Sequence, residues 1–306
     1  MMTADLTRGW AIAWASRQTV SMRPPRPRAD WAAEASAHAA RVDELTAGHR
    51  ERRARGEKHP VEDFLFEYYG HRPAQLRRWH PGLGVALAEA PEYAAWSGYV
   101  VDDDGVARVD DEGVIARRGR AVAFVRGLLE ATLSRPPHLG CFGMHEWAMV
   151  YRLAPGEQRH EQLPLRLGQA QTDAVVERHQ VRCSHFDAYR FFTEPARPLN
   201  QLRPTRDGQV GLEQPGCLHA GMDLYKWCFK LSPLIPSALT LDAFELARET
   251  RTLDMQASPY DVSGLGLSAV PVETAAGKAE YLERQRELAG RSNALRRRLL
   301  EVLPTP

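Results

Sequence analysis

Apolar residues recur at helical spacing over most of the chain, and proline or glycine separates the segments that carry this pattern. The most regular amphipathic stretch covers residues 114–133 and stops before Pro136 and Pro137. An alanine-rich, charged stretch over residues 30–55 predicts a long exposed helix whose N-cap is Asp30. We expect further helices over residues 59–69, 73–79, 141–151, 184–193, 218–231, 239–254 and 273–302.

One short stretch follows a different period. Residues 99–109 alternate around Asp104 and Gly105, a pair that is typical of the turn in a β-hairpin. Residues 163–182 are compatible with either helical or extended chain. The sequence therefore predicts a mainly α fold, which consists of a single multi-helix domain over residues 28–306 with a small β hairpin.

The N-terminal segment, residues 1–27, differs from the rest of the chain. Residues 22–28 are basic and rich in proline, so we expect the segment to be a flexible tail outside the domain. Its apolar patch, residues 10–14, is too short for a signal peptide. No apolar run in the chain reaches the roughly 18 residues that a membrane-spanning helix needs. These observations favour a cytoplasmic protein with no membrane partner.

Composition narrows the class of protein further. The 306 residues are 43% hydrophobic and 26% charged, values that exclude disorder of the whole chain. The formal net charge is only +1, so binding to nucleic acid would have to rest on a local basic patch. The four cysteines contain no Cys-x-x-Cys pair, which excludes a zinc ribbon and a thioredoxin-like motif, and we expect them to be reduced.

Several ionisable residues stand in otherwise apolar segments, where burial is unfavourable unless they are paired. They are His145 and Glu146 in residues 141–151, His185 and Asp187 in residues 182–193, His219 and Asp223 in residues 213–227, and Asp254 and Asp261 further on. His219 and Asp223 are four residues apart, so on a helix they lie on one face. That spacing suits two metal ligands, or a carboxylate that orients an imidazole as general base. Lys226, three residues after Asp223, is an alternative partner that would neutralise it.

From the residues alone, two interpretations of these ionisable side chains are possible. His145, His185, His219 and Asp223 are suitable ligands for iron, manganese or zinc in a metal-dependent enzyme on a helical scaffold. Alternatively, the polar residues form a structural network in a non-catalytic helical interaction protein. The chain contains no HExxH, P-loop, GxGxxG or GxSxG motif, so the enzyme classes that these motifs define are not indicated.

Residues 140–151, 182–200, 213–227 and 254–261 resemble a family of actinobacterial proteins generally labelled 3-methyladenine DNA glycosylase. The resemblance covers about residues 58–302 and leaves out the N-terminal segment. It implies hydrolysis of the N-glycosidic bond of alkylated purines in duplex DNA, without a cofactor. Such an enzyme flips the damaged base and stacks it on aromatic rings, while a carboxylate stabilises the charge that develops on the sugar.

The resemblance also implies roles for particular residues. Asp187 or Asp223 would be the carboxylate, and His145, His185 and His219 are the other catalytic candidates. The candidates for stacking on the base are Trp147, Tyr151, Tyr189, Tyr225 and Trp227. The candidates for contacts with DNA phosphates are Arg182, Arg190, Arg197, Arg203 and Arg206.

Overall fold

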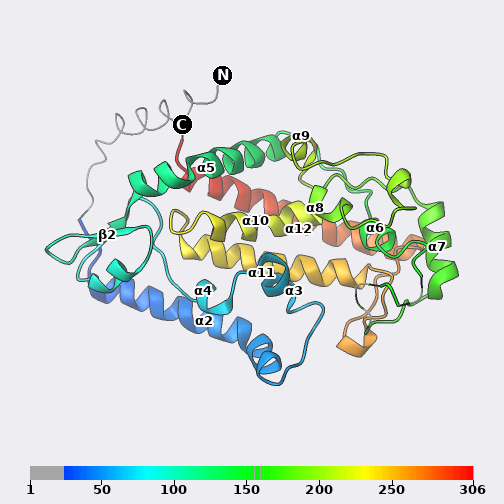
Figure 1. Cartoon of the computed structure of the whole chain (residues 1–306), viewed down its shortest axis with the longest axis horizontal. Coiled ribbons are helices and arrows are strands. Elements are labelled where there is room, and N and C mark those ends of the chain that lie inside the picture. The colour runs from blue at the N-terminus through cyan, green and yellow to red at the C-terminus, as the bar shows by residue number, and fades with distance from the viewer. Residues whose placement is uncertain (1–23, 155, 159, 161, 306) are drawn as a thin grey trace.

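Three long helices form the centre of the structure, a computed structural model that describes residues 24–305 except 155, 159 and 161. These helices, α10 (Leu218–Lys230), α11 (Ser237–Gln256) and α12 (Ala275–Val302), lie side by side (Figure 1). Helix α5 (Asp111–Leu133) packs along α12, and α2 (Arg28–Ala54) covers the opposite side of the group. The mainly α fold that the sequence predicts is confirmed.

The central helices are held together by apolar side chains at helical spacing. On α12, Tyr281, Leu288, Leu295 and Leu299 are buried, and the intervals of seven and four residues place them on one face. Helix α10 lies deeper than α12, because most of its residues are buried, including the charged Asp223. A charged side chain in such a position needs partners, and these partners build the site described below.

A small antiparallel sheet lies at one end of the molecule. Strands β2 (Tyr99–Val101) and β3 (Ala107–Val109) form the predicted hairpin, in which Tyr99 pairs with Val109. A third strand, β1 (Ala86–Leu87), which the sequence analysis did not predict, pairs with the other side of β3. The 3-10 helix η1 (Pro91–Ala95) connects it to β2.

The end of the predicted N-terminal tail is attached to this sheet. Arg26 forms a parallel bridge with Leu87, and its backbone N–H donates to the carbonyl of Ala86 at 2.8 Å. Residues 1–23 lie outside the described residues. Helix α2 begins at Arg28, directly after Pro27, so Asp30 lies in the first turn and is not the N-cap that we predicted.

The short helices differ most from the prediction. They are α3 (Phe64–Tyr69), α4 (Pro73–Leu76), α6 (Met144–Ala148), α7 (Gly168–Arg178), α8 (Phe186–Tyr189), η2 (Arg197–Leu199), α9 (Gln209–Leu212) and η3 (Ser263–Leu265). Four of them are shorter than expected: α3, α4, α6 and α8. Helix α6 starts late because Phe142 and Gly143 adopt left-handed backbone conformations, with φ of 46° and 69°. Helix α8 starts late as well, with His185 at its N-cap position.

Three other expectations, on residues 163–182, on the cysteines and on the absence of a membrane-spanning helix, agree with the described residues. The ambiguous residues 163–182 contain α7, and an isolated bridge between Val181 and Asn200 lies just beyond it. The four cysteines form no disulfide. Among the described helices, none combines the length and the apolar character needed to cross a bilayer.

The turn at residues 81–84 packs against the start of α11 and gives a stability test. Gly82 has φ of 89°, and a Cβ there would lie 2.6 Å from Cγ of Pro236. Gly84 has φ of 76°, but a Cβ at that position would have no described neighbour within 4 Å. We expect Gly84→Ala to lower the free energy of unfolding by about 1–2 kcal/mol through backbone strain. Gly82→Ala should lower it by a further 1–3 kcal/mol or so through overpacking. Urea denaturation measures both, and equal effects would contradict the packing described here.

Candidate functional site

A cavity of about 600 Å³ opens beside the central helices. Glu146 on α6, His219 on α10 and Arg251 on α11 line one part of it. Asp187 on α8 and the adjacent Arg190 also line it. Aromatic side chains complete the wall: Phe64, Tyr68, Phe191 and Tyr260. The cavity therefore combines acidic, basic and aromatic groups from segments that are distant in sequence.

The first group of charged residues behind this wall centres on Asp254. One oxygen of Asp254 lies 2.7 Å from Nε2 of His145, and the other accepts from Arg251 at 2.9 Å. Arg251 also donates to Glu146 at 2.8 Å. All four side chains are buried, and Asp254 is 0% exposed. The arrangement places two carboxylates against a guanidinium and an imidazole, so the buried charges can balance within the group.

The environment fixes the protonation of this first group. Burial acts to raise the pKa of Asp254, but His145 and Arg251 outweigh it and hold the pKa well below its usual range. Burial acts to lower the pKa of His145, and the Asp254 carboxylate raises it well above its usual value. Burial raises the pKa of Glu146 although Arg251 opposes the shift. The contact between the two residues therefore favours the imidazolium form of His145 and the carboxylate form of Asp254.

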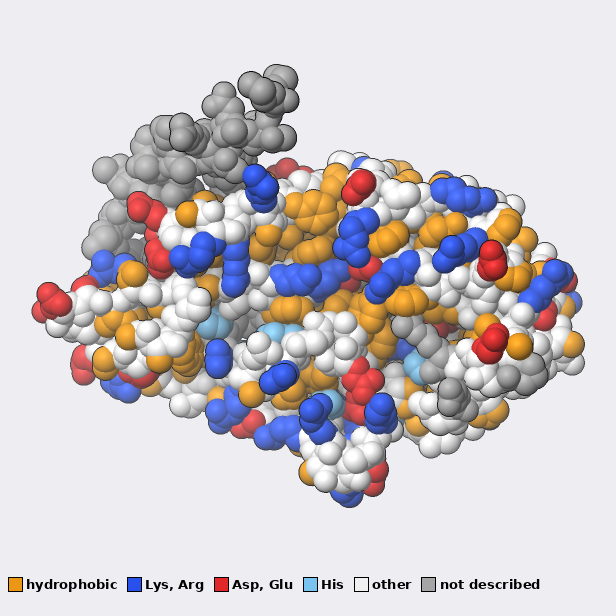
Figure 2. Space-filling view, viewed as in Figure 1, with side chains coloured by type: hydrophobic (Ala, Val, Ile, Leu, Met, Phe, Trp, Pro, Cys, Tyr) orange, Lys and Arg blue, Asp and Glu red, His pale blue; other side chains and the backbone are white. Residues whose placement is uncertain are grey.

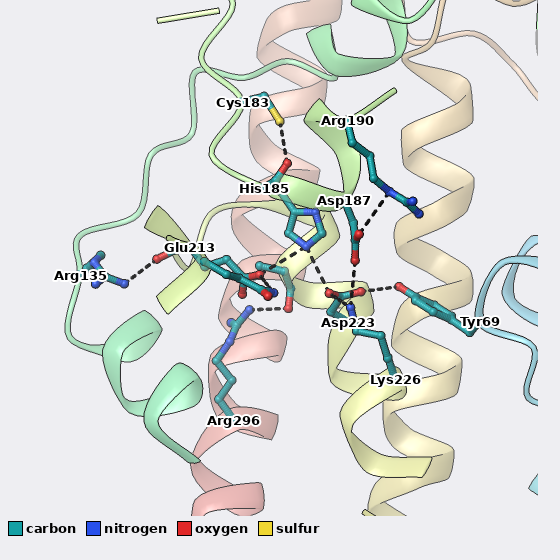
Figure 3. A network of polar contacts seen from close by, with 12 residues as sticks. Tyr69, Arg135, Cys183, His185, Asp187, Arg190, Glu213, Asp223, Lys226 and Arg296 are labelled. Atoms are coloured by element: carbon teal, nitrogen blue, oxygen red, sulfur yellow. Dashed lines mark hydrogen bonds and ion pairs between the residues drawn. The ribbon is translucent and has the colours of Figure 1, made fainter. Parts of the chain in front are cut away.

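The second group centres on Asp223, as Figure 3 shows. One oxygen of Asp223 accepts from the hydroxyl of Tyr69 at 2.8 Å. The other accepts from Lys226 and lies 3.2 Å from Nε2 of His185. The same His185 nitrogen is 3.4 Å from a carboxylate oxygen of Glu213, the residue that follows α9. Asp223, His185 and Glu213 are buried, so this group too is shielded from water.

Lys226 connects the second group to the cavity. Its ammonium nitrogen lies 3.4 Å from Asp187, whose other oxygen is 3.3 Å from Arg190. Burial acts to raise the pKa of Asp223, but Lys226 and His185 keep the pKa below its usual range. The alternative partner that the sequence suggested for Asp223, three residues further along the helix, is thus the one that it contacts. Asp187 and Arg190 also form the pair that their spacing allows.

His219 lies between the two groups. Its ring centroid is 4.4 Å from that of His145 and 5.4 Å from that of His185. Burial lowers the pKa of His219 well below its usual value, and the charge of His145 adds to this shift. His219 is therefore a neutral imidazole on the cavity wall, flanked by two histidines whose pKa values are raised. It does not contact Asp223 among the described hydrogen bonds, so the predicted Asp223–His219 acid–base pair is not formed.

The predicted catalytic residues separate into two layers. His219 and Asp187 line the cavity, whereas His145, His185 and Asp223 lie behind its wall and act on it through hydrogen bonds. The residues behind the wall have no access to a ligand in the cavity. They act on the lining residues by fixing their positions and by shifting their pKa values.

The predicted stacking residues are placed elsewhere. Trp147 and Tyr225 are 0% exposed, and each uses its polar atom in a structural hydrogen bond, to Ala257 and His71 respectively. Neither can stack on a ligand, which corrects the expectation from the sequence. Tyr151, Tyr189 and Trp227 line neither this cavity nor a second, smaller one described below.

The predicted phosphate contacts are dispersed. Arg190 lines the large cavity, and Arg182 lines the smaller, separate cavity. Arg197, Arg203 and Arg206 are exposed, and Arg203 donates to the nearby carbonyls of Pro198 and Leu202. A basic surface formed by all five arginines around one cavity is therefore not present in the structure.

The described residues include two sets of possible metal ligands, and the residues of the predicted metal site are divided between these two sets. In each set the ligand atoms lie within 4.8 Å of one another: His145, His219 and Asp254 in the first, and His185, Glu213 and Asp223 in the second. The predicted combination of His145, His185, His219 and Asp223 is thus not a single site. In each set the central carboxylate already forms an ion pair with a basic side chain, Asp254 with Arg251 and Asp223 with Lys226.

Sequence reasoning missed several residues of the site. Arg251 is buried on the inner side of α11, and its position three residues before Asp254 was a detectable signal. Glu213 carried no such signal, because its partner His185 is distant in sequence. Tyr69 and Tyr68 likewise appeared as ordinary aromatic residues of a short helix. Comparison with protein families, with curated proteins and with solved structures finds no match to this chain.

The buried ion pair of Arg251 and Asp254 gives a stability test. We expect Asp254→Asn to lower the free energy of unfolding by about 3–5 kcal/mol, because it leaves the Arg251 and His145 charges without their partner. The control is Asp242→Asn, which breaks a surface pair with Arg298 at 2.7 Å whose side chains are about half exposed. That change should lower it by about 1 kcal/mol or less. Urea denaturation at neutral pH measures both, and similar values would contradict the role of Asp254.

Proposed function

We propose that this protein hydrolyses the N-glycosidic bond of an alkylated purine, such as 3-methyladenine, in DNA. The observation that supports this proposal is the large cavity, which brings a carboxylate, a neutral imidazole and a set of aromatic rings together. Such a constellation suits a flipped base held by stacking, with its sugar near a negative charge. The resemblance of residues 58–302 to a glycosylase family agrees with this chemistry.

The aromatic side of the cavity suits a planar cationic base. Phe64 and Tyr68 are stacked with ring centroids 5.1 Å apart and an angle of 7° between their planes. Phe191 lies edge-on to Tyr68, at 6.5 Å. A purine methylated at N3 carries a positive charge, which aromatic faces attract. These rings replace the stacking residues that the sequence suggested.

Asp187 is the residue that we propose to stabilise the transition state. It is positioned by Lys226 and Arg190, and its side chain is 19% exposed, so it is accessible from the cavity. In the reaction, the bond between C1′ and the base nitrogen breaks and its electron pair neutralises the departing base. The sugar then carries oxocarbenium-like positive charge, which the Asp187 carboxylate stabilises. Water adds to C1′ and gives its proton to Asp187, while neutral His219 orients the water.

The proposed partner is duplex DNA, and the proposed location is the cytoplasm. Lys and Arg side chains are spread along the whole length of the face in Figure 2, with hydrophobic side chains between them. Arg190 is the basic residue that lines the cavity beside Asp187, and its guanidinium lies 3.4 Å from the hydroxyl of Tyr68. Phosphate contacts of this type would weaken steeply with salt.

The direct test is release of free base from alkylated duplex DNA, measured by chromatography. We expect the wild-type protein to release 3-methyladenine and Asp187→Asn to lower the rate by about 100-fold or more, since the amide lacks the negative charge. The control is Asp207→Asn, which changes an exposed carboxylate outside both cavities and should leave the rate unchanged. Circular dichroism verifies that both variants fold.

Two outcomes would contradict the proposal. One is that the wild-type protein releases no alkylated base from DNA. The other is that Asp187→Asn releases it as fast as the wild-type protein.

A second candidate is a metal-dependent enzyme, because two sets of three possible ligands occur close together. The set formed by His185, Glu213 and Asp223 suits iron, manganese or zinc by the chemistry of its donor atoms. A metal there would act as a Lewis acid or would activate water. Lys226 would have to leave Asp223, because a cation already occupies the carboxylate.

Metal analysis of the purified protein tests this second candidate. If it is correct, we expect about one equivalent of a transition metal, and Glu213→Gln should remove most of it, because a ligand is lost. Glu146→Gln is the control, since Glu146 is also buried but belongs to neither ligand set. Metal-free protein that releases alkylated base would reject this candidate and leave the glycosylase proposal in place.

A further inference from the structure

A second, smaller cavity of about 310 Å³ has a strongly basic wall. The end of α7, the loop before α6 and the start of α12 form it. Arg178, Arg182 and Lys278 line it together with His138 and His179, and its described lining contains no Asp or Glu. It shares no lining residue with the large cavity.

The three cations of this wall lack acidic partners. Nε of Arg178 donates to its own helix, at the carbonyl of Ala174, and Arg182 lies 3.5 Å from a ring nitrogen of His138. Lys278 lies 5.8 Å from the ring centroid of Phe142. No carboxylate oxygen of a described residue lies within 4.0 Å of any of these three cations, whereas other arginines nearby are paired, such as Arg166 with Glu273. Positive charges that converge without counter-charge attract an anion.

A buried nitrogen in the same wall has no partner. Nδ1 of His179 lies 2.6 Å from the carbonyl of Val175 and donates to it, so Nε2 is the free nitrogen. Nε2 of His179 is buried and makes no hydrogen bond to a described residue. Because Nδ1 carries the donated proton, Nε2 of the neutral ring is an acceptor, and the hydroxyl of a monoprotonated phosphate is a suitable donor to it. A buried polar atom of this kind is rare unless a ligand or water satisfies it.

The backbone beside the cavity is strained. Phe142, which lines it, has φ of 46°, a conformation that residues other than glycine seldom adopt. Strain of this kind accumulates at ligand sites, where the surrounding structure holds it in place. The Phe142 ring lies beside the ammonium group of Lys278 in the same wall.

We propose that this basic cavity binds the phosphate group of a phosphorylated ligand. The two arginines and the lysine provide donors for the oxygens, and the Phe142 ring provides an apolar face for the body to which the phosphate is attached. A phosphate suits the wall better than a carboxylate, because three cations offer more donors than one carboxylate accepts and a monoprotonated phosphate also brings a hydroxyl donor for His179. The site goes beyond the proposed glycosylase function, since none of its residues lines the large cavity.

Titration calorimetry of the full chain with pyrophosphate and with inorganic phosphate tests the site, at constant ionic strength set with chloride. We expect saturable binding that Arg182→Gln and Lys278→Gln each weaken about tenfold or more, since each removes a charge-assisted hydrogen bond. The control is Arg120→Gln, which removes an exposed charge of α5 outside both cavities and should change the affinity by less than about twofold.

A short duplex oligonucleotide is the second probe, and it separates the two sources of a phosphate group. Binding of pyrophosphate that depends on Arg182 and Lys278 assigns the site to a small phosphorylated molecule. Binding of the oligonucleotide alone, with the same dependence, assigns it to the DNA backbone. The inference is overturned if neither probe binds, or if Arg182→Gln and Lys278→Gln bind both probes as tightly as Arg120→Gln does.

Discussion

The buried ion pair between Arg251 and Asp254 is the interaction on which the site depends. A guanidinium that is 2% exposed loses its hydration, so it must be surrounded by acceptors in the folded protein. Asp254 provides one from the same helix, and Glu146 provides the other from α6. This requirement attaches the short α6 to α11 and places Glu146 and Arg251 together at the wall of the large cavity.

A second group of buried charges, on the neighbouring helix, likewise consists of a carboxylate paired with a cation three residues away. Asp223 of α10 is neutralised by Lys226 one turn later, and Tyr69 and His185 complete its shell. His219 stands between the two groups and faces both histidines. Because the buried carboxylates of both groups have a cation or a donor nearby, the charges are balanced by the chain itself. These contacts hold Glu146, Asp187 and Arg251 in defined positions on the cavity wall, as the proposed reaction requires.

The parts predicted well from the sequence are those set by local periodicity. The sequence predicted a helix over residues 218–231, and the structure has Leu218–Lys230, because apolar residues recur along the whole segment. Helix α6 was predicted too long, because left-handed residues at Phe142 and Gly143 delay its start. Glycine permits this conformation at residue 143, but phenylalanine seldom adopts it, so the pattern around residue 142 did not indicate the late start. The hairpin was predicted by its turn, whereas β1 was not, since two residues carry too little pattern.

In the site, too, local sequence pattern predicted some features, and tertiary packing determined the others. Polar residues in apolar segments correctly indicated a buried network, and His219 and Asp187 do line the cavity. Which partners they meet depends on tertiary packing, so Asp223 pairs with Lys226 and Tyr69 and not with His219.

The central claim is that the large cavity binds an alkylated purine base. A crystal structure of the protein with 3-methyladenine tests this claim most directly. We predict that the base lies in the large cavity, stacked on the Phe64–Tyr68 side with its N3 edge toward Asp187. Density for the base elsewhere, with the large cavity filled only by solvent, would contradict this account.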